Sequence, residues 1–501
     1  MLNQATTPLL DALRKCANSN HAPFYTPGHK RGQGISQHLV DCFGSNVFRA
    51  DLPELPQLDN LFAPQGVIQE AQQLAAAAFG AEYTWFLVNG STCGVEAAIL
   101  ATCGTGDKII LPRNVHSSAI AGLILSGATP VFVNPAYDPL LDIAHSITPE
   151  GVEAALEQHP DAKAVMIIYP TYYGVCGDVE AIAAIAHNYN IPLLVDEAHG
   201  AHFAFHPNLP VPALAAGADL SVQSIHKVLG AMTQASMLHV QGDLIDIDSV
   251  SKSLQLLQST SPSYLLLASL DAARQQMALH GEQLMSRTLY LADIARKQIS
   301  NISGLSVLEI PPCPPYQGGL GGSSFVALDQ TRLTVTVSGL GLTGFAADEI
   351  LAEQSVIAEL PSLQHLTFII SLGNTEADIE KLVQAFTTLA KRFGQGDKVT
   401  RGQGEKANGQ ISPCLPLSLS SPPLSPREAF YALKETVPIQ ETCDRISAEL
   451  ICPYPPGIPV LMPGEVITLE AIEYLQQIQA TGGFISGCAD TTLKTLKVVK
   501  S

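Results

Sequence analysis

The segment Leu220-Ser221-Val222-Gln223-Ser224-Ile225-His226-Lys227 decides how this chain folds, because it takes a short apolar run directly to a lysine. The run from Leu220 to Gln223 has the length and composition of a buried strand. A second run of this kind, Ile191 to Val195, leads into Asp196-Glu197-Ala198-His199. Because the carboxyl ends of neighbouring parallel strands meet at one edge of a sheet, we expect the amine and the carboxylate to lie close together.

Lys227 and Asp196 together predict a cofactor site. A lysine can form a Schiff base with an aldehyde, and its pKa falls readily when it is buried. Most lysines at strand ends are surface residues without a chemical role, and Lys227 considered alone fits this alternative equally well. A carboxylate at the next strand end changes the interpretation, since pyridoxal phosphate (PLP) needs both a lysine for its aldehyde and an acid for its ring nitrogen.

The region from about 80 to 240 alternates short apolar runs with helical patterns. Such alternation predicts an α/β fold with a mostly parallel, doubly wound sheet that binds ligands at the carboxyl ends of its strands. The expected strands are Thr84–Val88, Lys108–Leu111, Thr129–Val133, Ala164–Tyr169, Pro192–Val195 and Leu220–Gln223. The expected helices are Gly94–Ala101, Ser117–Leu125, Val179–Asn188 and a long one over about Pro262–Gln298.

These patterns divide the chain into five parts. An N-terminal segment, 1–79, precedes the large PLP-binding domain at 80–260, and a smaller α/β domain follows at 261–393. Residues 394–426 are rich in Gly, Ser and Pro and cannot bury enough apolar surface to fold alone, which predicts a flexible linker. The last part, 427–501, is expected to be a separate C-terminal α+β domain.

Composition narrows the class of protein. Among 501 residues, 27 basic against 46 acidic side chains give a net charge of −19, which argues against binding nucleic acid and suits a cationic small molecule. The ten cysteines include no C-x-x-C pair, so we expect reduced thiols, no metal site and a cytoplasmic location. Neither a signal peptide nor an apolar run of about 18 residues is present, so no membrane association is expected.

A phosphate site is predicted at Asn89-Gly90-Ser91-Thr92-Cys93-Gly94, between a strand and a helix. Gly90 lets the backbone approach closely, the hydroxyls of Ser91 and Thr92 can donate, and a helix N-terminus favours an anion. The same residues also fit a loop that ends in a helix N-cap and binds no phosphate. His116 follows the next strand and is expected to lie over the pyridine ring, although a hydrogen-bonded loop histidine is the alternative.

Longer motifs extend this pattern over almost the whole chain and resemble the Orn/Lys/Arg decarboxylase family in its shorter bacterial form. The matching stretches are 25–30 (YTPGHK), 89–92 (NGST), 170–174 (PTYYG), 196–202 (DEAHGAH), 224–227 (SIHK), 258–264 (QSTSPSY) and 453–459 (PYPPGIP). Two departures lie where substrate or loop contacts are expected. The family often has a lysine where this chain has Ser117, and two acids where it has Leu58-Asp59-Asn60-Leu61.

The resemblance implies the PLP-dependent transferase fold of type I, like that of aspartate aminotransferase, and PLP as the cofactor. It implies that Lys227 holds PLP, that Asp196 pairs with the ring nitrogen, and that Ala198 and His116 cover the two ring faces. His226 or Lys227 would return a proton to the α-carbon. The implied phosphate contacts are Gly90, Ser91, Thr92, Ser224 and His226. Thr260 and Ser261 are expected to reach the partner subunit of a homodimer or of a higher homo-oligomer.

The implied reaction is decarboxylation of arginine, lysine or ornithine to CO2 and the corresponding polyamine-pathway amine, with a lean to arginine. The substrate's distal cation needs an acid, for which Glu465 is the first candidate and Asp59 the second. One alternative is an aminotransferase, which usually clamps the carboxylate with an arginine, and the stretch 365–371 (HLTFIIS) carries none. The other is a non-catalytic binding protein on the same fold.

Overall fold

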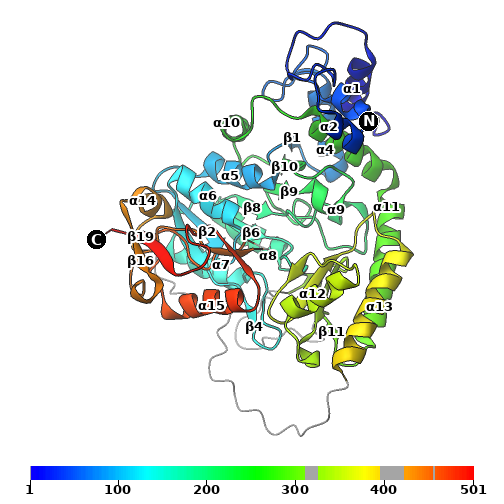
Figure 1. The fold of residues 1–501 in the computed structure, drawn as a ribbon. Coiled ribbons are helices and arrows are strands. Elements are labelled where there is room, and N and C mark those ends of the chain that lie inside the picture. The colour runs from blue at the N-terminus through cyan, green and yellow to red at the C-terminus, as the bar shows by residue number, and fades with distance from the viewer. Residues whose placement is uncertain (1, 311–324, 395–421, 455–456, 501) are drawn as a thin grey trace. The chain divides into compact units, whose positions relative to one another are not determined.

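The computed structural model describes residues 2–310, 325–394, 422–454 and 457–500. The chain forms two compact units, each built from two stretches of sequence (Figure 1). The first unit comprises Met1–Thr102 and Pro192–Ser286, and the second comprises Cys103–Ile191 and Arg287–Ser501.

The first unit contains four paired strands in the order β1, β10, β9, β8. Strands β8 (Leu193–Asp196) and β9 (Leu220–Gln223) are parallel, whereas β10 (Ser236–Val240) runs antiparallel to both β9 and β1 (Tyr83–Leu87). The helical elements of this unit are α1 (Pro8–Asn18), α2 (Gln37–Phe43), α3 (Ser45–Ala50), α4 (Val67–Phe79), α5 (Gly90–Thr102), η1 (Phe203–Phe205), α9 (Ile225–Val228), α10 (Ile247–Leu257) and most of α11 (Tyr264–Ser300).

Helix α5 packs closely on this sheet because Gly94 lacks a side chain. A Cβ placed on Gly94 would lie 2.6 Å from Cγ1 of Val222 and 2.8 Å from Cδ1 of Leu87, closer than carbon atoms approach without a clash. The close contact keeps the start of α5 near the end of β9. The predicted phosphate residues and Lys227 are thus carried by neighbouring elements.

In the second unit, β6 (Ala164–Ile168), β2 (Lys108–Pro112) and β3 (Thr129–Val133) form a parallel group. Helices α6 (Ser117–Ser126), α7 (Pro149–Gln158) and α8 (Val179–Asn188) belong to the same part of the chain. The short strands are β4 (Tyr137–Asp138) paired with β5 (Ile143–Ala144), and β7 (Val175–Cys176) paired with β12 (Ala327–Leu328).

A four-stranded antiparallel sheet in the second unit has the order β11, β13, β15, β14. Its apolar core joins the end of α11 to α12 and α13 through buried residues such as Leu291, Leu333, Leu351 and Phe386. The elements are β11 (Ser306–Val307), β13 (Arg332–Thr336), η2 (Ser338–Leu340), α12 (Gly344–Glu353), β14 (Leu360–Pro361), β15 (His365–Ile369) and α13 (Glu376–Phe393).

The C-terminal part has its own apolar core, centred on α15 (Leu469–Ala480) and the pair β16 (Lys434–Pro438) and β19 (Thr495–Val499). Figure 1 shows these elements grouped near the C-terminus, with α14 (Pro426–Tyr431) beside α6. Arg427 connects α14 to α6, because its Nη1 donates to the carbonyl oxygen of Leu125 at 2.7 Å. The remaining elements are η3 (Ile439–Glu441), β17 (Cys452–Tyr454) and β18 (Phe484–Ser486).

The six expected strands are confirmed, with ends that agree to within one residue. The four expected helices are confirmed too, although α5 begins four residues before the expected Gly94. Strand β10 was not predicted. The predicted linker 394–426 falls mostly on residues 395–421, which lie outside the described residues, and the other domain limits stay predictions.

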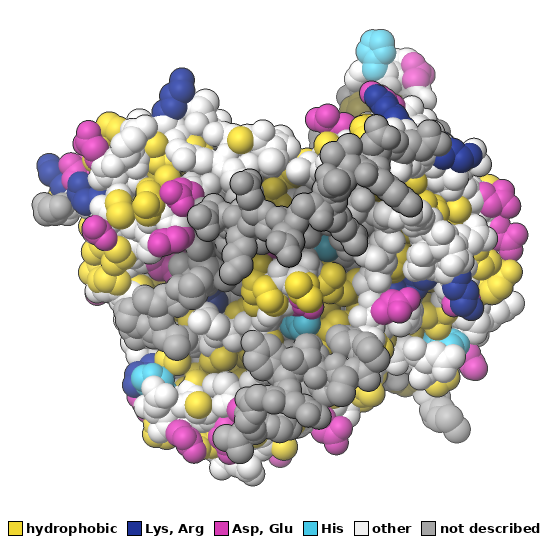
Figure 2. All heavy atoms as spheres, turned by 90° about the horizontal axis from the view of Figure 1, so that it is seen from below, with side chains coloured by type: hydrophobic (Ala, Val, Ile, Leu, Met, Phe, Trp, Pro, Cys, Tyr) yellow, Lys and Arg dark blue, Asp and Glu magenta, His cyan; other side chains and the backbone are white. Residues whose placement is uncertain are grey.

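The face drawn in Figure 2 carries acidic and basic side chains singly or in small groups, without a continuous basic patch among the residues drawn in colour. Across the described residues, no helix combines the length and the apolar character that crossing a membrane requires.

Candidate active site

Lys227 and Asp196 stand at the ends of adjacent parallel strands, as the sequence predicts. Asp196 is the last residue of β8, and its register partner on β9 is Val222. Lys227 lies in α9, which begins directly after Ser224 at the end of β9. The Asp196 side chain is largely buried and accepts a hydrogen bond from the Ala198 N–H at 3.2 Å. This contact orients a carboxylate at the sheet edge that also carries the lysine.

His199 is a further functional candidate, and the sequence motif 196–202 that contains it does not by itself predict a role for it. Its Nε2 lies 3.0 Å from Nζ of Lys227, and its side chain is buried. In a hydrogen bond between two nitrogens one donates and the other accepts, so a proton lies between the His199 ring and the Lys227 amine. A signal was present in the sequence, because His199 follows Asp196 by three residues in the turn that leaves β8.

Two predicted phosphate residues meet in the structure. Ser224 Oγ donates to Ser91 Oγ at 2.7 Å, which brings the end of β9 to the first turn of α5. Gly90 adopts a φ of +75°, a left-handed conformation that suits glycine, and Thr92 is exposed. Hydroxyls and the amide groups of a helix start are donors that suit a phosphate. With Lys227 and Asp196 nearby in the fold, this donor set fits PLP.

Glu197, next to Asp196, has a different environment and is fully buried. Its carboxylate accepts from the Ala213 N–H, from Ser221 Oγ and from Gln223 Nε2, at 2.9, 2.5 and 2.9 Å. Burial raises the pKa of Glu197 to about 7, although these hydrogen bonds lower it. Because Ser221 and Gln223 belong to β9, the network ties β9 to the turn after β8 and supports the strand that leads to Lys227.

His239 on the unpredicted strand β10 continues this network. Gln223 donates through its Nε2 to Glu197, so its Oε1 is the acceptor for Nε2–H of His239 at 3.2 Å. Nδ1 of His239 then accepts from Thr84 Oγ at 2.7 Å. Burial lowers the pKa of His239 to about 3, which keeps this histidine neutral. The polar side chain of His239 is therefore satisfied inside the sheet.

Thr260 and Ser261 are both exposed in the chain. Gln258, two residues before Thr260, accepts from the Val88 N–H at 2.8 Å, and Asn89 donates through Nδ2 to the carbonyl oxygen of Leu257 at 3.1 Å. The segment that carries Thr260 and Ser261 is thus fixed beside the turn that leads to Gly90. Their predicted contact with a partner subunit stays a prediction.

His116 lies in the second unit and caps α6. Its Nδ1 accepts from the Ser118 N–H at 3.2 Å. A backbone amide can only donate, so Nδ1 carries no proton and the neutral ring has its proton on Nε2. Ser117, where the family often has a lysine, donates through its backbone N–H to the carbonyl oxygen of Gly457 at 3.1 Å. The loop before α6 is therefore joined to the C-terminal part of the chain.

Asp59 accepts hydrogen bonds from backbone N–H groups at and before the start of α4, and does not face an open binding site. Its Oδ2 accepts from the N–H groups of Gly66, Ile68 and Gln69, and its Oδ1 from those of Asn60 and Gln65. Burial alone would raise the pKa of Asp59, but the hydrogen bonds from the backbone outweigh burial and hold the pKa below its ordinary value. These contacts occupy both carboxylate oxygens and argue against the predicted role as a substrate contact.

We expect Asp59→Ala to lower the free energy of unfolding by about 1 kcal/mol, in the range of lost helix caps, with the KM for the amino acid unchanged within about twofold. The exposed Asp243→Ala is the control. Since folding lowers the pKa of Asp59, its stabilisation is present above the unfolded-state pKa and is lost as the pH falls through the folded-state value. Urea unfolding at neutral and acidic pH measures both effects, and a tenfold higher KM without loss of stability would restore Asp59 as a substrate contact.

Glu465 forms a buried ion pair instead of facing open space. Its Oε1 and Oε2 accept from Nε and Nη2 of Arg113 at 3.1 and 2.9 Å, and Oε2 also accepts from the Met462 N–H at 3.0 Å. The side chains of Glu465 and Arg113 are 15% and 7% exposed. A carboxylate engaged in this way has little capacity left for a substrate cation, so the geometry argues against the predicted substrate contact of Glu465.

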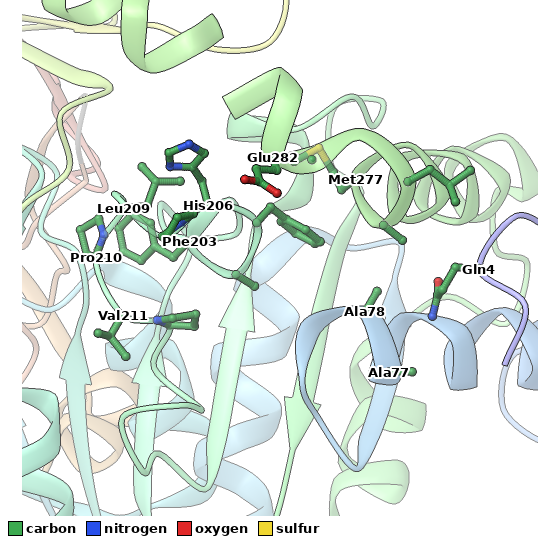
Figure 3. A pocket seen from close by; sticks show the side chains of 17 residues that line it. Gln4, Ala77, Ala78, Phe203, His206, Leu209, Pro210, Val211, Met277 and Glu282 are labelled. Atoms are coloured by element: carbon green, nitrogen blue, oxygen red, sulfur yellow. The ribbon is translucent and has the colours of Figure 1, made fainter. Parts of the chain in front are cut away.

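A separate cavity of about 750 Å³ lies in the first unit (Figure 3). Its wall comes from α4, from α11 and from the chain after β8, with residues such as Ala77, Phe203, Val211 and Met277. None of the predicted cofactor residues lines this cavity. Within the described ranges, no group of three or more His, Cys, Asp and Glu side chains is arranged to hold a metal ion.

The fold and the paired lysine and aspartate define a PLP-dependent enzyme of fold type I. Solved lysine decarboxylases share the fold: lysine decarboxylase A from Pseudomonas aeruginosa superposes with a TM-score of 0.83 at 24% identity, covering 99% of this chain and 81% of that one. The Orn/Lys/Arg decarboxylase major-domain model matches residues 7–313, and the model for the C-terminal domain matches 415–490. The chain belongs to the Orn/Lys/Arg decarboxylase family.

Curated relatives agree over the full length. The arginine decarboxylase of Bacillus subtilis (strain 168) is 41% identical over 100% of this chain and 99% of its own length. The arginine decarboxylase of Halalkalibacterium halodurans is 42% identical over 100% of this chain and 99% of its own length. The reaction class that the sequence predicts, PLP-dependent decarboxylation of a basic amino acid, is thereby confirmed.

Proposed function

We propose that this enzyme decarboxylates L-arginine, with Lys227, Asp196, His116 and His226 as its catalytic residues. The observation that carries the proposal is the placement of Lys227 and Asp196 at the ends of β9 and β8, with Nζ of Lys227 3.0 Å from His199. The preference for arginine over lysine and ornithine is supported by the names of the full-length relatives at 41 and 42% identity.

When bound, PLP supplies an electron sink for the electron pair left on the α-carbon as CO2 departs. Lys227 would hold the aldehyde group of PLP through its amine, and Asp196 would place a negative charge at the ring nitrogen. Ser91, Thr92, Ser224, His226 and the Gly90 backbone would hold the phosphate. Ala198 and His116 would cover the ring, and His226 or Lys227 would deliver a proton to the α-carbon.

His199 adds a proton partner for Lys227. The buried imidazole of His199 lies 3.0 Å from Nζ of Lys227, where it would give a proton to this amine or take one from it. The proposal also includes a homodimer, in which Thr260 and Ser261 reach the partner's phosphate site, and a cytoplasmic location.

An aminotransferase would need to hold the substrate carboxylate firmly. Strand β15, where such enzymes usually carry an arginine, reads His365-Leu366-Thr367-Phe368-Ile369. Arg332 on the neighbouring strand β13 is fully buried, with Nε 3.8 Å from a carboxylate oxygen of Asp329. A tight carboxylate contact would stabilise the ground state and oppose loss of CO2, so a strand without arginine suits a decarboxylase.

The test supplies arginine, lysine and ornithine in turn to the purified enzyme with PLP and measures CO2 and the amine product. We expect arginine to give the highest kcat/KM. A keto acid in place of CO2 would support the aminotransferase, whereas no turnover together with no visible absorption band of lysine-bound PLP would support a non-catalytic binding protein.

A further inference from the structure

We propose that Arg113 is a positioning residue: with Glu465 it fastens the segment 457–465 to the loop that carries His116, and it thereby holds the imidazole of His116 in place. The inference rests on the proposed function, in which His116 covers the PLP ring. It gives the C-terminal part of the chain a role at the cofactor that does not require contact with the substrate.

Arg113 forms hydrogen bonds with three residues of this segment, Pro459, Val460 and Glu465. It is the first residue after β2, and its guanidinium donates to the carboxylate of Glu465 through Nε and Nη2. Nη1 donates to the carbonyl oxygen of Pro459 at 2.9 Å, and Nη2 also donates to that of Val460 at 3.2 Å. The planar fork of arginine is suited to such a set of acceptors, whereas a lysine offers a single point charge.

The other end of the same segment lies against His116. A Cβ on Gly457 would be 3.2 Å from Nε2 of His116, and Gly457 adopts a φ of +84° that glycine tolerates best. The Gly457 carbonyl oxygen accepts from the Ser117 N–H at 3.1 Å. The loop from Arg113 to Ser117 is thus joined to the segment at both of its ends.

The ion pair is largely shielded from water, since the side chains of Arg113 and Glu465 are 7% and 15% exposed. Removal of either partner would leave the other charge without its ion pair in a place that water hardly reaches. The pair therefore fixes the segment, and the segment lies beside Nε2 of His116. Nδ1 accepts from the Ser118 N–H, and Gly457 lies so close to Nε2 that a Cβ on it would be 3.2 Å away.

The experiment measures how fast diethyl pyrocarbonate modifies His116 in the full-length enzyme, with and without PLP, by mass spectrometry. We expect slow modification in the wild type, because the segment shields Nε2. Arg113→Gln and Glu465→Gln should each speed modification of His116 about tenfold, as expected for loss of a charge-assisted contact, and Arg113→Lys should lie between. The kcat should fall and the affinity for PLP should weaken, while the KM for arginine stays within about twofold.

Matched glycines provide the control. Gly457→Ala places a methyl group against His116, whereas Gly482→Ala introduces a similar strain, at a φ of +93°, where no atom lies within 4 Å of the new Cβ. We expect faster modification of His116 in Gly457→Ala alone. If Arg113→Gln fails to fold, the double variant Arg113→Gln/Glu465→Gln removes both charges together and leaves no unpaired charge.

Three outcomes overturn the inference. The first is that His116 is modified at the wild-type rate in both Arg113→Gln and Gly457→Ala. The second is that Gly482→Ala speeds modification as much as Gly457→Ala does, and the third is that a higher KM is the only change in Glu465→Gln. The last result would make Glu465 the contact for the distal cation. The proposed function is tested separately, because it fails if the wild-type enzyme releases no CO2 from any basic amino acid. Even then, the modification rates of His116 decide the role of Arg113.

Discussion

Lys227→Ala is expected to lower decarboxylation by at least about 10⁴-fold, comparable with the loss of other catalytic nucleophiles. Lys227 is the lysine at the end of β9, next to Asp196 on the parallel strand β8, and its Nζ contacts His199. Neither alanine nor a neighbouring hydroxyl can form the covalent link to the aldehyde of PLP. Release of ¹⁴CO2 from labelled arginine measures the loss, and the visible absorption band of lysine-bound PLP should disappear with it.

The control for Lys227→Ala is Lys252→Ala, on the exposed side of α10. This variant should keep both the activity and the absorption band. PLP is expected to remain weakly bound to Lys227→Ala through the hydroxyls of Ser91 and Ser224, and dialysis should remove it faster than from the wild type. A Lys227→Ala enzyme with wild-type turnover and an unchanged band would disprove the assignment of this lysine.

Asp196→Asn is expected to lower kcat about 10³-fold or more, which corresponds to about 4 kcal/mol of activation free energy. Asparagine has nearly the same shape and can still accept from the Ala198 N–H, so the local backbone should be retained. What is lost is the negative charge that keeps the ring nitrogen protonated. Without this charge the ring draws electrons from the α-carbon less strongly, and the step that releases CO2 slows.

Asp248→Asn, on the surface of α10, is the control for the loss of one negative charge and should retain wild-type kinetics. The thermal midpoint of Asp196→Asn should be measured alongside, because a loss of activity without a loss of stability is the signature of a catalytic charge. Unchanged turnover in Asp196→Asn would mean that another group protonates the ring nitrogen.

Hydrophobic pattern and chain order predicted the elements that carry the cofactor residues. Short runs that contain apolar or β-branched residues, such as Leu220–Gln223 and Thr129–Val133, coincide with β9 and β3. Both β9 and the unpredicted β10 bury polar residues, since β9 holds Ser221 and Gln223 and β10 holds Ser236 and His239. His239 is tolerated inside because Thr84 and Gln223 satisfy its nitrogens, and those partners come from two other strands.

The sequence by itself determined the fold class, the placement of Lys227 and Asp196 at strand ends, and the family, because these follow from local periodicity and from motifs of adjacent residues. Only the tertiary structure decided what the remaining carboxylates contact. Asp59 caps a helix that begins eight residues later, and Glu465 pairs with Arg113, 352 residues away in the chain. A carboxylate near a predicted site looks the same in sequence whether it faces a substrate or a buried guanidinium. Its role depends on which donors the folded chain brings within hydrogen-bond distance. For Glu465 the deciding donor is distant in the sequence, whereas the donors to Asp59 lie within ten residues and reach its carboxylate only through the conformation of the loop before α4.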